Sequence, residues 1–87
     1  MEDNTNLLFV TVNSRKGKLF EGNAKSVTSF NKVGRFDVLG KHANFISLIE
    51  KEVLIHKRDD TVDPIPLTNG VMRVVNNQVD IYVGIKK

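Results

Sequence analysis

The chain has 87 residues, enough for one small domain with one hydrophobic core, and we expect residues 1–87 to form that single domain. It has 13 basic and 10 acidic residues, a formal net charge of +3 and no cysteine, which excludes a disulfide framework or a cysteine-based zinc site as support for the fold. No apolar stretch approaches the ~20 residues of a membrane span, and the first four residues are not basic, so the sequence predicts a soluble protein without a targeting segment.

Alternating apolar residues predict a series of short β-strands. The expected extended runs, in chain order, are residues 8–12, a run beginning at 19–20, then 25–30, 36–38, 45–49, 53–56, 62–67, 71–75 and 79–85. Polar or glycine-containing segments separate them, as in residues 13–17 and 31–34. The sequence therefore predicts an all-β fold, a small β-sandwich or flattened barrel of about nine to ten short, mostly antiparallel strands.

One segment is also compatible with a helix. Phe45, Ile46, Ile49 and Val53 would lie on one side of an α-helix, and residues 50–52 are good helix formers. Because the segment is short and its flanks are rich in β-forming residues, we expect it to be extended.

Prolines and asparagines predict an edge and two turns. Pro64 and Pro66 cannot donate to a β-ladder, so residues 62–67 are expected at a sheet edge. Residues 69–70 (Asn-Gly) and 76–77 (Asn-Asn) tolerate positive φ and are expected to form turns.

The titratable residues do not form a recognisable catalytic pattern. The aspartates at positions 59, 60 and 63 are explained by a polar turn, where Asp bonds the local backbone. His56 is expected on the solvent face, opposite Val53 and Ile55, and Asp37 is expected to point away from its apolar neighbours at an exposed or edge position. His42 lies in a turn, where a hydrogen bond within its own loop is the simplest account, although a ligand, base or interface role is open. We therefore predict no enzyme activity and no catalytic, metal or cofactor site.

Nucleic-acid binding has weak support in the sequence. The only basic cluster near an aromatic residue is residues 15–18, which is better explained as a solvated turn. No predicted helix follows Gly34 or Gly40, so a phosphate-binding loop is not indicated either. The remaining class of function is an interaction module.

Five short motifs occur in a specific order along the chain. They are residues 17–22 (Gly-Lys-Leu-Phe-Glu-Gly), 24–27 (Ala-Lys-Ser-Val), 34–43 (Gly-Arg-Phe-Asp-Val-Leu-Gly-Lys-His-Ala), 69–71 (Asn-Gly-Val) and 77–81 (Asn-Gln-Val-Asp-Ile). Together they resemble the N-terminal β-sandwich of the ε subunit of F-type ATP synthases, and the resemblance covers essentially the whole chain.

The resemblance implies a mechanical part rather than an enzyme. In that family the sandwich lies at the foot of the central stalk, holds the γ subunit and rests on the polar loops of the membrane-embedded c-ring. It implies a peripheral location on the cytoplasmic face of the bacterial plasma membrane without direct membrane insertion, and a role in coupling proton transport to ATP synthesis. A free-standing β-barrel module that binds protein or nucleic acid is the alternative.

The chain departs from the family pattern in its central motif. The family usually has Gly at the position of Asp37, often Pro-Gly at 40–41 and Pro at the position of Asn44, and often an acidic residue where this chain has Arg35. By resemblance, the interface residues expected at the ring-facing end are Arg35, Lys41, His42 and Asn44. Many members continue into an inhibitory C-terminal helical hairpin, which nothing after Ile85 can form, so we expect coupling without that brake.

Overall fold

A computed structural model describes residues 7–41 and 44–84, and in these ranges it contains seven β-strands and no helix. The strands are β1 (Leu8–Ser14), β2 (Gly17–Ala24), β3 (Ser26–Phe30), β4 (Arg35–Leu39), β5 (Phe45–His56), β6 (Val62–Val75) and β7 (Gln78–Val83). The all-β prediction is confirmed, and the segment that could have been a helix is part of β5. The strand count is lower than predicted because β5 and β6 each join two runs that the sequence pattern divides.

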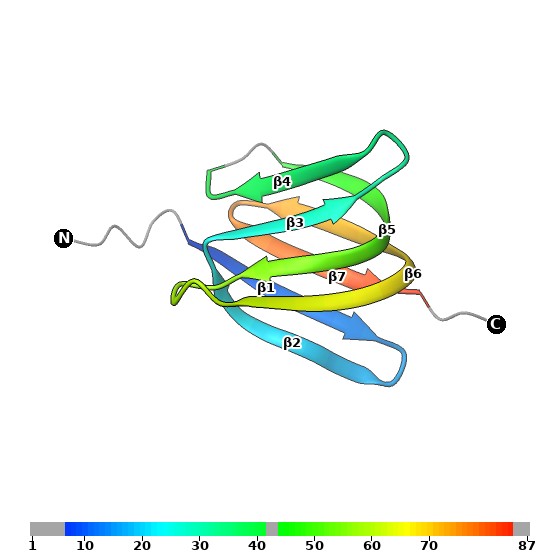
Figure 1. Ribbon diagram of the computed structural model, residues 1–87, viewed down its shortest axis with the longest axis horizontal. Coiled ribbons are helices and arrows are strands. Elements are labelled where there is room, and N and C mark those ends of the chain that lie inside the picture. The colour runs from blue at the N-terminus through cyan, green and yellow to red at the C-terminus, as the bar shows by residue number, and fades with distance from the viewer. Residues whose placement is uncertain (1–6, 42–43, 85–87) are drawn as a thin grey trace.

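The strands form one mixed sheet in the order β2-β1-β7-β6-β5-β3-β4. All neighbours are antiparallel except β1 and β7, which run parallel, with Val10 opposite Val79 and Val12 opposite Ile81. The sheet is closed over itself by the two long strands, which curl together on the right of Figure 1.

The bend in β5 and β6 divides the sheet into two layers. Residues 45–49 of β5 pair with the C-terminal part of β6, and that part of β6 also pairs with β7. Residues 51–56 of β5 pair with the N-terminal part of β6, and this part of β5 also pairs with β3. The register shifts between Ile49 and Lys51, and Lys51 has a φ of 75°. One layer therefore contains β7, β1 and β2, and the other contains β3 and β4.

The predicted turn at Asn69-Gly70 is wrong, because β6 continues through these residues. An antiparallel partner on each side holds Gly70 in the sheet, opposite Ile49 and Val83. A Cβ at Gly70 would lie 2.7 Å from the carbonyl oxygen of Tyr82, so glycine serves here for close strand approach. The Asn76-Asn77 turn is confirmed, with φ values of 49° and 66°.

The folded-over sheet has two distinct ends. The bend end contains the β1–β2 turn, the β3–β4 turn and the bends of β5 and β6, since Phe30 pairs with Glu50 and the N–H of Gly84 donates to the carbonyl of Asn69 (2.7 Å). The loop end contains residues 40, 41 and 44, the β5–β6 turn and the β6–β7 turn. These two names are used below.

The core lies between the layers and contains inward residues of all seven described strands, of which β2, β3 and β4 contribute one each. Its members are 2% exposed or less: Leu8, Val10, Val12, Ala24, Val27, Val38, Ile49, Val53, Ile55, Met72, Val74, Val79 and Ile81. Phe36 and Phe45 pack against it edge to face, with ring centroids 6.1 Å apart. Two hydroxyl side chains of β3, Thr28 and Ser29, are also buried, and Ser29 Oγ donates to the carbonyl of Glu52 (2.9 Å).

The edge prediction for residues 62–67 is confirmed. This half of β6 pairs with β5 on one side, whereas β7 pairs only with residues 70–75. Along a strand, the backbone N–H and C=O groups of successive residues point alternately to one side and to the other. The backbone groups of Pro64 and Pro66, two residues apart, therefore point to the same side, which faces away from β5. Their missing N–H groups remove two donors from the open edge.

Candidate partner interface

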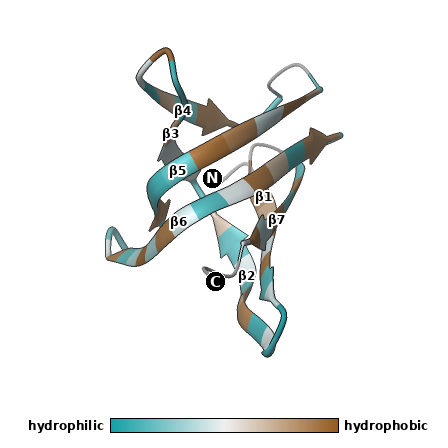
Figure 2. Ribbon diagram, turned by 90° about the vertical axis from the view of Figure 1, so that its right-hand side faces the viewer, coloured by the Kyte–Doolittle hydropathy of each residue, from teal (hydrophilic) through white to brown (hydrophobic). Residues whose placement is uncertain are grey.

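The outer surface of one layer carries apolar side chains on three adjacent strands. Leu48 on β5 lies opposite Val71 on β6, which lies opposite Tyr82 on β7, and Ile46 is two residues from Leu48 on the same face. Ile46, Leu48 and Tyr82 are 67%, 72% and 54% exposed. We call these four residues the outer apolar row. Apolar stretches of β5 and β6 run side by side in Figure 2.

A polar cluster borders this row on the same face. The carboxylate of Asp80, whose side chain is only 16% exposed, accepts a hydrogen bond from Thr11 Oγ1 (2.9 Å) and one from Gln78 Nε2 (3.2 Å). Arg73 Nη1 lies 3.6 Å from its other oxygen. An apolar centre with satisfied polar groups at its side is the usual composition of a protein–protein interface.

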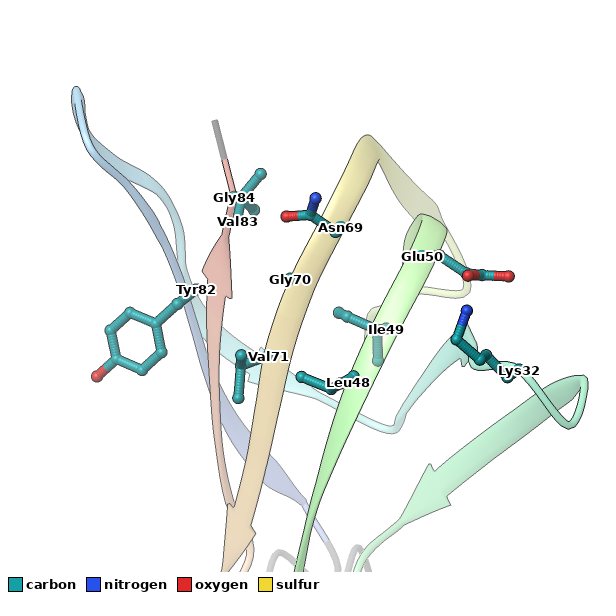
Figure 3. A pocket seen from close by; sticks show the side chains of 10 residues that line it. All are labelled: Lys32, Leu48, Ile49, Glu50, Asn69, Gly70, Val71, Tyr82, Val83 and Gly84. Carbon is teal, nitrogen blue, oxygen red and sulfur yellow. The ribbon is translucent and has the colours of Figure 1, made fainter. Parts of the chain in front are cut away.

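A groove of about 540 Å³ continues the outer apolar row towards the bend end. Leu48, Val71 and Tyr82 belong to both, and Ile49, Val83, Gly70, Gly84 and Asn69 complete most of its lining. Figure 3 shows the Tyr82 ring on the far side of β7 and the side chains of Lys32 and Glu50 together on the opposite side. The groove therefore joins the exposed apolar face to a charged rim.

The predicted interface residues do not share one end of the fold. Arg35 begins β4 at the bend end, and its Nη2 lies 3.8 Å from Asp37 Oδ1, while Lys41 follows β4 at the loop end with a φ of 65°. Asn44 also lies at the loop end, where its Oδ1 accepts a hydrogen bond from the N–H of Asn76 (2.9 Å). The five-residue strand β4 separates Arg35 from Lys41 and Asn44, so the structure brings the last two together but not Arg35. His42 lies outside the described residues.

The predicted interface residues at the loop end make hydrogen bonds within the protein. The N–H of Lys41 donates to Asn77 Oδ1 (2.6 Å), so the two asparagine side chains tie the segment after β4 to the β6–β7 turn. These contacts give Asn44 a structural role.

The exposed position of Asp37 is confirmed, and His56 lies on the face opposite Val53 and Ile55 as expected, although it is half-buried rather than open to solvent. Thr28 Oγ1 donates to Asp37 Oδ1 (2.5 Å), so its oxygen accepts the Nε2–H of His56 at 2.9 Å. The hydroxyl bonds the carboxylate directly and the imidazole bonds the hydroxyl, which is a network across β4, β3 and β5 rather than a base aligned on a nucleophile.

Residues 7–41 and 44–84 contain no cluster of three His, Cys, Asp or Glu side chains able to hold a metal ion. In the same ranges there is no helix with the length and apolar character needed to cross a membrane.

The outer apolar row is the site that sequence reasoning missed. The sequence predicts an extended run at residues 45–49, which are apolar at four of five positions, but does not say which face Ile46 and Leu48 occupy. A strand with apolar residues at both odd and even positions is either buried on both faces or carries an exposed apolar face. The sequence of this strand was therefore compatible with an exposed apolar face.

The fold and this face together define a small β-sandwich domain with an exposed apolar surface. Residues 7–84 match the family model described as ATP synthase, Delta/Epsilon chain, beta-sandwich domain, and the chain belongs to this family.

The relatives that the chain resembles are ATP synthase epsilon chains. That of Sulfurimonas denitrificans is 35% identical over 68 residues, covering 77% of this chain and 52% of the relative. That of Helicobacter pylori (strain 26695) is 32% identical over 75 residues, covering 86% of this chain and 61% of the relative. The chain thus spans about half to three-fifths of the length of these relatives.

Solved structures share the fold at low sequence identity. The cryo-EM structure of Euglena gracilis mitochondrial ATP synthase, OSCP/F1/c-ring, contains a chain with a TM-score of 0.83 at 15% identity, covering 95% of this chain and 53% of that one. A chain in the central stalk/c-ring structure of Tetrahymena thermophila mitochondrial ATP synthase gives 0.72 at 14%, covering 90% of this chain and 63% of that one. These similarities establish the fold, and the relatives and structures named here give no support to a free-standing module.

Proposed function

We propose that the protein is an ε-type subunit of an F-type ATP synthase, a non-catalytic rotor component that links the γ subunit to the c-ring. It couples proton transport to ATP synthesis by transmitting torque, and it lies at the cytoplasmic face of the bacterial plasma membrane through the complex rather than by insertion. Family membership supports this proposal, as do the names of the relatives.

The observation that carries the proposal is the outer apolar row. A monomeric domain of this size gains nothing from exposing Ile46, Leu48 and Tyr82 on one face, whereas a permanent partner would remove them from water. We assign this face to the γ subunit, because a rotor requires its most durable contact there and apolar burial is what stabilises an obligate interface.

Co-expression with the γ subunit of the same source tests the proposal. We expect a stoichiometric complex in size-exclusion chromatography and a sub-micromolar Kd in calorimetry, and Leu48→Arg should weaken binding by at least about tenfold because it places a charge at the centre of the interface.

Leu39→Arg is the matched control, because Leu39 is 57% exposed but lies on the edge strand β4, away from the row. It should leave γ binding unchanged. Separate elution of a folded wild-type domain and γ would contradict the rotor assignment, and equal losses from the two variants would contradict the assignment of the face.

A further inference from the structure

A small polar hollow borders the outer apolar row on the same face of the sheet. Its volume is about 250 Å³, and its lining residues are Arg73, Val75, Asn76, Gln78 and Asp80. Arg73 lies opposite Ile46 on β5 and two residues from Val71 on β6, so it continues the face of the row. A partner that covers the row therefore also covers this hollow, which we call the Arg73 hollow.

The carboxylate in the Arg73 hollow is already used within the protein. Asp80 Oδ1 accepts hydrogen bonds from Thr11 Oγ1 (2.9 Å) and Gln78 Nε2 (3.2 Å), and the Asp80 side chain is only 16% exposed. Thr11 lies on β1 and pairs directly with Asp80 on β7. A covered carboxylate with these two donors offers little to an incoming cation or hydrogen-bond donor.

The guanidinium in the Arg73 hollow is the opposite case. Arg73 Nη1 lies 3.6 Å from Asp80 Oδ2, which is close enough for an ion pair but too long for a hydrogen bond. The Arg73 side chain is 55% exposed, and over residues 7–41 and 44–84 no protein acceptor takes a hydrogen bond from its guanidinium. The hollow therefore presents a planar, positively charged fork of N–H donors to a partner.

Water solvates these donors only while the face is open. A partner that buries Ile46 and Leu48 displaces that water, and a buried donor without an acceptor costs free energy. The ion pair with Asp80 does not replace the lost hydrogen bonds, because its atoms are too far apart. The partner must therefore supply an acceptor of its own at this point.

We propose that the Arg73 hollow receives a carboxylate of the γ subunit, from an aspartate or glutamate side chain, and that this pair selects the partner. The inference rests on the proposed function, because it takes the outer apolar row as the γ-facing surface. It adds the chemical group that γ must present beside that row. An apolar row by itself discriminates poorly between apolar surfaces, whereas a charge pair at its border penalises a surface that lacks the acid.

A carboxylate fits the Arg73 hollow better than a carbonyl group or a cation. Its two oxygens match the guanidinium fork and accept two parallel hydrogen bonds, whereas a single carbonyl oxygen engages the fork at one point. A cation of γ would meet the exposed Arg73 before it reached the covered Asp80. The expected partner group is therefore an acid.

Calorimetric titration of the domain with the γ subunit of the same source tests the proposal, with parallel runs at about 50 and about 300 mM NaCl. We expect Arg73→Gln to weaken γ binding by at least about tenfold at low salt and to remove most of its salt dependence, because it removes the charge that attracts the carboxylate. Asp80→Asn breaks the same internal ion pair but keeps the guanidinium, so γ binding should stay unchanged or become tighter. Arg58→Gln, at an exposed arginine in the β5–β6 turn, is the matched control and should have no effect.

A scan of the γ subunit identifies the acid. The surface aspartates and glutamates of γ are replaced one at a time by the corresponding amides. We expect one replacement that weakens binding of the wild-type domain but not of the Arg73→Gln variant.

Three results would overturn the inference. They are equal losses from Arg73→Gln and Asp80→Asn, which would mean that Arg73 acts only by supporting the fold, a loss from Arg73→Gln that is independent of salt, or a γ scan without a coupled acid. The Leu48→Arg variant separates this test from the proposed function. If the wild-type domain does not bind γ, the rotor assignment fails, whereas if Leu48→Arg weakens binding and Arg73→Gln does not, only the role of the Arg73 hollow is refuted.

Discussion

Gly70 shows how much a single missing side chain contributes where strands come close together. An alanine Cβ would meet the Tyr82 carbonyl at 2.7 Å, and this backbone cannot move without disturbing β7. We expect Gly70→Ala to lower the free energy of unfolding by about 1–3 kcal/mol in denaturant titrations.

Gly22→Ala is the control for this substitution. Its Cβ would meet only the Phe20 ring at an ordinary 3.5 Å, and Gly22 lies in the edge strand β2. We expect no loss of stability, or a small gain from the reduced freedom of the unfolded chain. Equal effects at the two glycines would refute the close-approach explanation.

Asp59 is held in its ionised form by Thr61. The Thr61 hydroxyl donates to Asp59 Oδ1 (2.6 Å) and the Thr61 N–H donates to the same atom (3.0 Å), and these two bonds, the hydroxyl first, lower the pKa of Asp59 below its ordinary value of 3.8. Since the folded pKa is the lower one, the resulting stabilisation is present above the unfolded pKa and is lost as pH falls through the folded pKa.

Thr61→Val should therefore raise the pKa of Asp59 towards its ordinary value, and carbon-detected NMR titration of its carboxyl group measures this directly. Thr61→Ser keeps both donors and should leave the pKa low. If the pKa of Asp59 stays low in the valine variant, the hydrogen bond from the backbone N–H of residue 61, rather than the one from the hydroxyl, causes the shift.

At the scale of the elements, the N-terminal half of β6 is an exposed edge protected by its two prolines. Replacing Pro64 and Pro66 with valine restores two N–H donors to this edge, so we expect concentration-dependent self-association in analytical ultracentrifugation. Val62→Thr, on the same edge, changes a side chain without adding a backbone N–H donor and should remain as monomeric as the wild type. A monomeric double variant would show that the edge is covered by something other than proline.

Most strands could be predicted from alternation and turn residues, but the long hairpin could not. The sequence pattern divides β5 near residue 50, where residues 50–52 interrupt the apolar run, and β6 near Asn69, where Asn-Gly is typical of a turn. In β6 the inward residues also change parity there, from Ile65 and Leu67 to Met72 and Val74. A parity change is produced equally by a turn and by a bend in a continuous strand. Only pairing with β5 and β7, which are distant in sequence, decides between them.

The candidate site was less predictable than the strands, because it also depends on pairing between segments that are distant in the sequence. The predicted extended run 36–38 already separates Arg35 from Lys41, but the resemblance groups them by their place in one motif rather than by their place on the strand. The outer apolar row depends on three strands meeting in register. Contacts of this kind are outside the reach of local patterns.

At the scale of the whole molecule, the two layers should unfold together. They share β5 and β6 and a single core, so loss of one layer exposes the apolar face of the other. We expect Val79→Ala to cost about 2–3 kcal/mol, with one midpoint for Tyr82 fluorescence and for far-UV circular dichroism. Val62→Ala, at a 45% exposed position, should change stability by less than about 0.5 kcal/mol. Separate midpoints for the two signals would show that the layers are independent.

The parallel pairing of β1 with β7 also determines how the domain resists force. The first strand starts at the loop end and the last strand finishes at the bend end, so tension applied between those two points acts along the strands. Sliding β1 past β7 then requires all the hydrogen bonds between them to rupture at once, whereas a pull across the strands would open them one at a time. The domain is therefore stiffest along its strands, and a load carried from one end to the other meets its strongest direction.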